Sequence, residues 1–271
     1  MKFENWLPFG FVLLLGPSTA WALDPGTSDA RAIAKAVEDR NTGDRGTSEA
    51  TLTLTDKNGR QRVRKVRQTT MNFAGGKKTL IFFESPADVR NTGFLSVDYD
   101  DGKKDDDQWL YLPSLHKATR ISSADRSGSF MGTDISYADM TKKDLADYEY
   151  SLIEASAKVD GDDCWVIESR PRTEQEKKET GYLKTQIWVS KQKLMPLQVK
   201  SWVLEGKKIK FIKFSDVRQV QGIWVGQSMT VRSVRGTEVE STTTLTLQNV
   251  KFEQAGVTAE QFSERRLEQG L

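Results

Sequence analysis

Apolar and polar residues alternate with a period of two along most of the chain. Runs such as EATLTLTD, KTLIFFES and LKTQIWVS are rich in Thr, Val and aromatic residues, and turn sequences such as KNGR, YDDGKK and VDGDD separate them. Alternation broken by such joints is typical of antiparallel strands connected by hairpins. The pattern predicts a long meander of about a dozen strands.

A few segments depart from this period. Near the N-terminus, apolar residues recur at helical spacing: Ala30, Ile33, Ala34 and Val37. They predict an amphipathic helix over roughly residues 29–40, with Ser28 as its cap. SPADVRNTG predicts a short helical turn between two strands. Near the C-terminus, Thr258 predicts the cap of a final helix, with Val257 packing on Phe262.

The stretch KTLIFFES differs from the other strands, because residues 80–83 are apolar on both faces. A long twisted sheet with one apolar face must close or be covered, since open edges aggregate. With few helices available, such a sheet curls around its own side chains or around a ligand. We therefore expect a mainly β protein whose curved antiparallel sheet forms a barrel or half-barrel plugged by helices.

The N-terminus carries the features of an export signal. Lys2 precedes a short apolar run over residues 7–15, and Ala20 and Ala22 follow at A-x-A spacing. The run is too short for a membrane-spanning helix, which needs roughly 20 apolar residues. The pattern is typical of a secretory signal peptide cleaved after Ala22. We expect residues 1–22 to be the signal and residues 23–271 to form one exported domain.

Charge and reactive residues narrow the function. The 40 basic and 38 acidic residues nearly balance, which argues against nucleic acid as a partner. His116 is the single histidine, so it cannot build a histidine-rich metal site, and the single Cys164 lacks a histidine neighbour to activate it. The acidic run over residues 98–107 lacks the register of a calcium loop. We expect no enzyme activity, cofactor or metal.

Two stretches remain as candidates for binding. In SGSFMGTDISYADM, residues 127–140, we expect a lid in which Phe130 and Met131 cover a hydrophobic mouth and Asp134 caps a short helix. The basic strand RQRVRKVR places Arg64 on one face and Arg67 on the other. Such a strand suits phosphate headgroups, and it equally suits an edge strand that uses charge to prevent aggregation.

Three ordered motifs carry a family resemblance: FFESPADVRNTGFLSVDYD, DDQWLYLPSLHKATRI and GSFMGTDISYADM. Together they resemble the bacterial outer-membrane lipoprotein-sorting proteins, LolA-like periplasmic proteins often encoded beside RND/MMPL-type exporters. The resemblance implies an incomplete β-barrel whose opening is covered by helices, a hydrophobic cavity that accepts acyl chains, and no catalytic residues. The carrier proper has an arginine-proline strand motif whose arginine latches the lid. Here that pair is missing, and Arg64 and Arg67 are the candidates for its role.

Two functions follow from the resemblance. One is a periplasmic carrier of lipid or lipoprotein acyl chains toward the outer membrane, working with an RND/MMPL-type exporter and touching membranes only transiently. The other is an accessory subunit of such an exporter without lipid cargo. Since each exposed CH₂ costs about 0.8 kcal/mol in water, a carrier needs a shielded apolar pocket. Candidate cavity or lid residues are Leu80, Phe82, Phe94, Trp109, Tyr111, Phe130, Met131, Tyr137 and Trp188. Candidates for binding a headgroup or partner are Arg62, Arg64 and Arg67.

Overall fold

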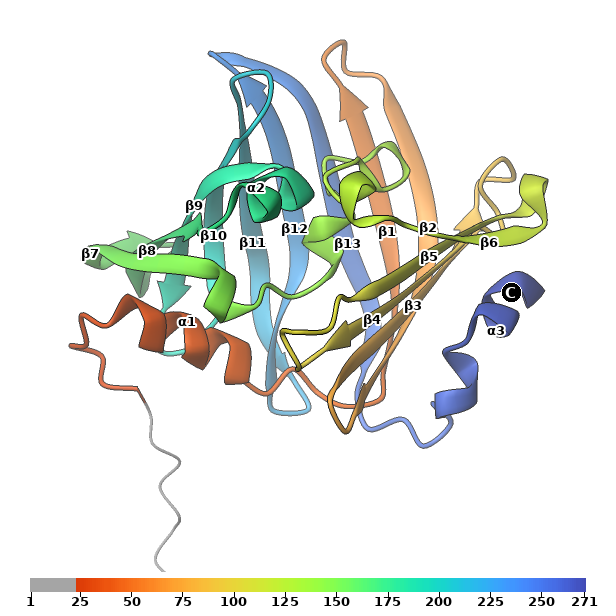
Figure 1. Ribbon diagram of the computed structural model, residues 1–271, viewed down its shortest axis with the longest axis horizontal. Coiled ribbons are helices and arrows are strands. Elements are labelled where there is room, and N and C mark those ends of the chain that lie inside the picture. The colour runs from red at the N-terminus through yellow and green to blue at the C-terminus, as the bar shows by residue number, and fades with distance from the viewer. Residues whose placement is uncertain (1–22) are drawn as a thin grey trace, which may run out of the picture.

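A computed structural model describes residues 23–271, so the predicted signal peptide lies outside the described residues (Figure 1). Within this range, thirteen strands form one antiparallel sheet. The strands are β1 (Gly46–Asp56), β2 (Gln61–Phe73), β3 (Gly76–Ser85), β4 (Gly93–Tyr99), β5 (Asp107–Leu112), β6 (Lys117–Arg120), β7 (Tyr148–Val159), β8 (Asp162–Pro171), β9 (Tyr182–Ser190), β10 (Pro196–Val203), β11 (Lys208–Val220), β12 (Ile223–Arg235) and β13 (Glu238–Lys251). The alternating runs identified in the sequence all form strands.

The sheet is built from two meanders joined along one line. Strand order is β6-β5-β4-β3-β2-β1-β13-β12-β11-β10-β9-β8-β7. The join pairs β1 with β13, where Leu52 lies opposite Leu245. Strands β6 and β7 are the two edges and do not pair with each other, so the sheet curves without closing (Figure 1). The predicted half-barrel is confirmed.

Three α-helices accompany the sheet within the described residues: α1 (Ala30–Asp39), α2 (Glu174–Thr180) and α3 (Glu264–Gln269). Helix α1 matches the predicted helix, but its cap is Asp29, which accepts a hydrogen bond from the Ala32 N–H at 3.0 Å. None of the helices in residues 23–271 combines the length and apolar character needed to cross a bilayer.

Two local predictions need correction. SPADVRNTG is not helical: the Val89 N–H bonds the Pro86 carbonyl at 3.2 Å, and the Thr92 N–H bonds the Val89 carbonyl at 3.0 Å. These i to i−3 bonds make successive tight turns, and none of the i to i−4 bonds of an α-helix is present between β3 and β4. Thr258 caps only a 3₁₀ turn, and α3 begins later with Ser263 as its cap.

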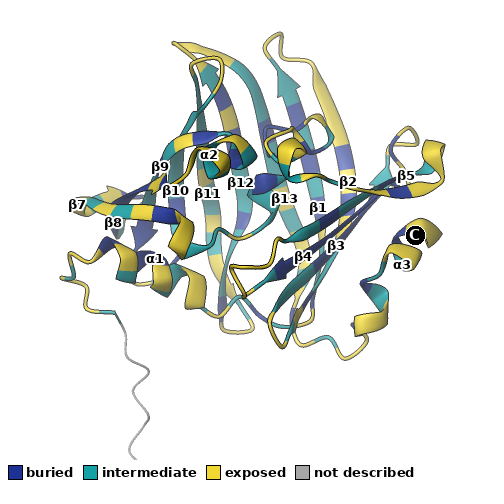
Figure 2. Cartoon of the chain, in the orientation of Figure 1, coloured by how far each residue is buried: buried dark blue, intermediate teal, exposed yellow. Residues whose placement is uncertain are grey.

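Different segments of the chain pack on the two faces of the sheet. On β3, Ile81 and Phe83 point to the inner face, toward the segment that links β6 to β7. The alternate residues Leu80 and Phe82 point to the outer face, where they pack with Leu267 of α3. Strand β4 is buried along nearly its whole length for the same reason (Figure 2). The two-sided apolar character of KTLIFFES thus reflects two separate cores.

Candidate functional site

The segment that links the edge strands β6 and β7, residues 121–147, crosses the inner face of the sheet (Figure 1). We call it the strap. It contains the predicted lid, residues 127–140, and has no α-helix. The expected short helix is a single 3₁₀ turn over Ala138–Met140, and Tyr137 at its start makes no side-chain cap.

The centre of the strap is an aromatic plug. Phe130 is only 3% exposed and packs edge-on against Phe94, with ring centroids 5.1 Å apart. Tyr137 lies 5.7 Å from Phe130 and Phe83 lies 6.0 Å from it, measured between ring centroids. Edge-to-face pairs at these distances stabilise each other beyond the area they bury. Phe130 therefore fills the inner face and does not lie on a rim.

An arginine from the sheet holds the backbone next to this plug. The guanidinium of Arg64 on β2 donates to the carbonyl of Met131 and lies over the Phe83 ring, 5.8 Å from its centroid. Arg64 is 8% exposed, and this burial above all lowers the pKa of its guanidinium. Arg62 points to the same face but is exposed, and Arg67 pairs with Glu84 at 2.6 Å on the outer face. Of the three predicted arginines, Arg64 is the one that contacts the strap.

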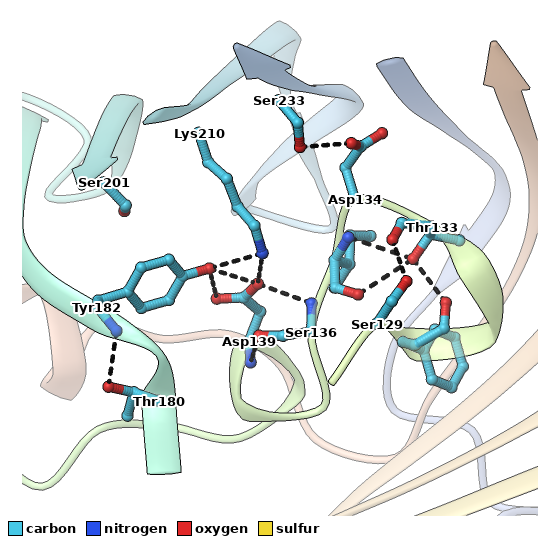
Figure 3. A network of polar contacts seen from close by, with 12 residues as sticks. Ser129, Thr133, Asp134, Ser136, Asp139, Thr180, Tyr182, Ser201, Lys210 and Ser233 are labelled. Carbon is cyan, nitrogen blue, oxygen red and sulfur yellow. Dashed lines mark hydrogen bonds and ion pairs between the residues drawn. The ribbon is translucent and has the colours of Figure 1, made fainter. Parts of the chain in front are cut away.

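Asp134 ties the strap to β12 and β13. Its carboxylate accepts a hydrogen bond from the hydroxyl of Ser233 at 2.6 Å (Figure 3). It also accepts from the hydroxyls of Thr243 at 2.7 Å and Ser241. The backbone N–H of Asp134 also donates to Thr243 Oγ1 at 2.9 Å. The predicted helix cap is therefore wrong. Hydroxyls from two distant strands satisfy the carboxylate, so it does not bind local backbone N–H groups.

Asp139 ties the strap to two strands of the same half of the sheet that lie nearer the β7 edge. It accepts from the Tyr182 hydroxyl on β9 at 2.9 Å and lies 3.4 Å from the Lys210 ammonium on β11 (Figure 3). The Ser136 N–H adds a third bond at 2.9 Å. Burial alone would raise the pKa of Asp139, but Lys210 and the Ser136 N–H outweigh it and hold the pKa below its ordinary value.

Two cavities border the strap. One of about 680 Å³ lies toward β9, β11 and β12, and one of about 550 Å³ lies toward β1, β2 and β13. Both have Gly132, Asp134 and Ser241 in their walls. Their volumes fall in the range of about 300–1,000 Å³ found for small-molecule sites. The strap thus lies between the two cavities, and its polar ties at Met131, Asp134 and Asp139 alternate along the chain with the plug residues Phe130 and Tyr137.

The two reactive residues noted in the sequence lie away from this hollow. Burial, and then the neighbouring Asp162 and Asp163, raise the pKa of Cys164 to about 11, so its thiolate is scarcely populated at neutral pH. His116 is exposed in the turn before β6. Neither is placed for nucleophilic or acid–base chemistry with the residues of the strap.

Comparison with known proteins identifies the family. A family model described as "Uncharacterized protein" matches residues 75–269. The chain belongs to this family, DUF1329. A DUF1329 family protein from Desulfovibrio piger is 29% identical with a TM-score of 0.79, and the match covers 90% of this chain and 99% of that one. No curated protein matches the chain.

Two further solved structures place DUF1329 among the lipoprotein-sorting folds. A protein described as an outer membrane lipoprotein-sorting domain from Vibrio parahaemolyticus is 28% identical, with a TM-score of 0.78 and coverage of 88% of this chain and 98% of that one. A LolA superfamily protein from Nitrosomonas europaea has a TM-score of 0.65 at 16% identity, covering 88% and 98% respectively, which shows the shared fold. The predicted resemblance to the lipoprotein-sorting proteins is confirmed.

The structure divides the candidate cavity residues of this DUF1329 protein into three groups. Phe94, Phe130, Met131 and Tyr137 come together in and around the plug. Four others pack on the outer face with the C-terminal segment: Leu80, Phe82, Trp109 and Tyr111. Trp188 packs with Cys164 in a separate cluster. The nine therefore do not line one surface, because alternate residues of a strand point to opposite faces.

Sequence reasoning missed the residues that tie the strap down. The hydroxyls of Ser233, Ser241 and Thr243 lie on β12 and β13 among many similar threonines and serines, and no local pattern marks them. Helix α2 was also missed, although Thr173 followed by Glu176 is a recognisable start signal, and the Thr173 side chain does cap it, accepting from the Glu176 N–H.

Proposed function

We propose that this protein is a periplasmic carrier that binds acyl chains of a lipid or lipoprotein on the inner face of its sheet and delivers them toward the outer membrane. The observation that carries the proposal is the aromatic plug: Phe130 occupies an apolar inner face and is held there by polar ties. In this proposal Phe130 leaves the inner face when an acyl chain binds there. The similarity to a lipoprotein-sorting domain supports the same reading.

The energetics favour replacement of the plug by a longer chain. Burying one phenylalanine side chain contributes about 1.5–3 kcal/mol, whereas ten methylenes of an acyl chain contribute about 8 kcal/mol. The ties of Arg64, Asp134 and Asp139 are polar, and each is worth only about 1–3 kcal/mol net because water replaces its partners. An acyl chain that displaces Phe130 and breaks no more than one of these ties therefore enters beneath the strap at a net gain.

The proposed function also includes where the protein acts in the cell and what supplies its cargo. Residues 23–271 would act as one exported domain after removal of the signal, meeting membranes only transiently. An inner-membrane RND/MMPL-type exporter is the proposed source of the cargo. No catalytic step is part of this function, since binding and release need only the strap to move.

The test is to purify the periplasmic protein without detergent, extract it with organic solvent and analyse the extract by mass spectrometry. We expect one class of acyl lipid to recur, and a fluorescent fatty-acid analogue to bind the stripped protein. Arg64→Met should speed uptake of this probe, because it removes the bond to the Met131 carbonyl. Arg67→Met is the matched control, since Arg67 lies on the same strand but faces outward. Lipid-free extracts together with no probe binding by either variant would refute the carrier.

An accessory subunit of the exporter is the second candidate. It is favoured by the exposed cations of β2, which a protein partner can contact on either face: Arg62 on the inner face, and Lys65 and Arg67 on the outer face. In that case exporter binding would weaken on neutralising these cations, while extracts would contain no lipid. The two measurements separate the candidates.

A further inference from the structure

A third cavity, distinct from the two beside the strap, lies where the connection from α1 to β1 runs along the inner face. Its volume is about 310 Å³. In Figure 1 this connection follows the lower edge of the sheet, from α1 to the start of β1. One side of the cavity is apolar and comes from β11, β12, β13 and the residue that follows β13: Phe214, Ile223, Trp224, Val225, Leu247 and Phe252.

The other side of the cavity carries two cations. Arg40 follows the end of α1 and donates one hydrogen bond to the Trp224 carbonyl at 3.2 Å. Lys77 lies on β3, on the same face as Ile81. Both line the cavity and are half-buried. Within residues 23–271, neither forms a salt bridge.

These cations are poorly compensated. Burial lowers the pKa of Arg40, and burial above all lowers the pKa of Lys77, where Asp98 opposes the shift and Arg40 adds to it. Asp98 lies directly across from Lys77 on β4, yet burial and then Asp106 raise its pKa to about 7. It therefore carries only part of a charge near neutral pH. Asp44 is the other nearby carboxylate, and it bonds the Asn72 N–H and pairs with Arg45.

Two half-buried cations that face a shared space without a salt bridge are unfavourable, and an anion between them would relieve this cost. The apolar wall beside them adds a requirement, because a small inorganic anion would leave that surface in water. A ligand that matches both the two cations and the apolar wall has an anionic head and an apolar tail. Charge-assisted hydrogen bonds to the guanidinium and the ammonium would hold the head.

The size of the cavity limits the tail to one chain. A methylene group takes about the volume of a water molecule in the liquid, about 30 Å³, so the cavity accepts roughly ten such groups. That is enough for a single medium-length chain or the first part of a longer one. The cavity does not have the volume for two such chains side by side.

We propose that this cavity binds the carboxylate end of a fatty acid, with the head between Arg40 and Lys77 and the chain along Phe214 and Leu247. The inference deepens the proposed acyl-chain function and rests on it. It adds a preference for a free anionic head and places the ligand at a second location, whose lining contains no residue of the strap.

The test compares decanoate with 1-decanol, which share a chain length but differ in head charge, by titration below their aggregation limits. We expect decanoate to bind at least about tenfold more tightly, as charge-assisted bonds predict. Lys77→Met and Arg40→Gln should each reduce this preference to about twofold or less, leaving decanol unchanged. Lys78→Met is the matched control: Lys78 is the neighbouring residue but points to the other face, over the Phe73 ring at 5.4 Å. It should keep the preference.

Trp224 reports the location, because it lines the cavity. The decanoate-induced change in tryptophan fluorescence should disappear in Trp224→Phe. Equal binding of decanoate and decanol would overturn the preference for an anionic head while leaving the acyl carrier intact. Displacement of decanoate by acetate at similar concentration would also overturn it, since the apolar wall would then play no part. Binding of neither ligand here, with probe uptake beneath the strap retained, would refute this site alone.

Discussion

Replacing Phe130 with alanine separates the plug from ordinary core packing. Phe130 is 3% exposed and contacts three aromatic rings, so its loss leaves a space in the middle of the inner face. Phenylalanine-to-alanine changes at such sites cost about 3–5 kcal/mol of unfolding free energy. We expect a loss in this range in urea denaturation.

The same change should strengthen acyl binding. An incoming chain no longer has to expel a buried ring, which is worth about 1.5–3 kcal/mol. The affinity for a fluorescent fatty-acid analogue should therefore rise by roughly 10- to 150-fold, since about 1.4 kcal/mol corresponds to a factor of ten. Stability and affinity thus move in opposite directions, which simple damage to the core would not produce.

Phe82→Ala is the control for this prediction. Phe82 is 5% exposed and equally part of a core, but on the outer face beside α3. It should lose similar stability and gain no affinity. Should the milder Phe130→Leu and the alanine variant both bind the probe no better than Phe82→Ala, the ligand does not replace the plug and the reasoning fails.

Two further predictions concern the carboxylates of the inner face. Asp134→Ala removes the acceptor for three hydroxyls and should cost about 3 kcal/mol, with faster hydrogen exchange confined to the strap; unchanged exchange there would contradict its role as a tie. The pKa of Asp98 is raised to about 7, so its contribution to stability is fully present below about pH 4, the usual carboxyl pKa, and is lost as the pH rises through about 7. Asp98→Asn should therefore be more stable than wild type at pH 8, with the difference vanishing near pH 4; a difference that grows in acid would refute the sign.

The sequence predicted the strands well because each has its own evidence. Alternation in runs such as EATLTLTD, bounded by turns such as KNGR, is local information, and the same holds for the helical spacing around Ile33. The predicted half-barrel also followed, since a long sheet with few helices has few ways to cover its apolar face. These features needed no knowledge of distant contacts.

The site was predicted less well, because it depends on contacts between distant residues. The sequence KTLIFFES indicates that both faces of β3 are buried. Only the folded structure shows that Phe83 faces the plug and Phe82 faces α3. Asp134 has the local signature of a cap, yet Ser233, about a hundred positions further along, provides a better donor within the fold. Alternation fixes which residues share a face and leaves open which face is the inner one.

The strap is also the connection between the two edge strands, and this has a mechanical consequence. A segment whose ends are fixed at β6 and β7 spans the curved sheet as a chord spans an arc, and Arg64, Asp134 and Asp139 attach it along the way. A ligand that lifts the strap pulls on the two edge strands through its ends, so we expect the separation between β6 and β7 to change on binding. Spin labels on the two edges would measure this change without touching the binding surface.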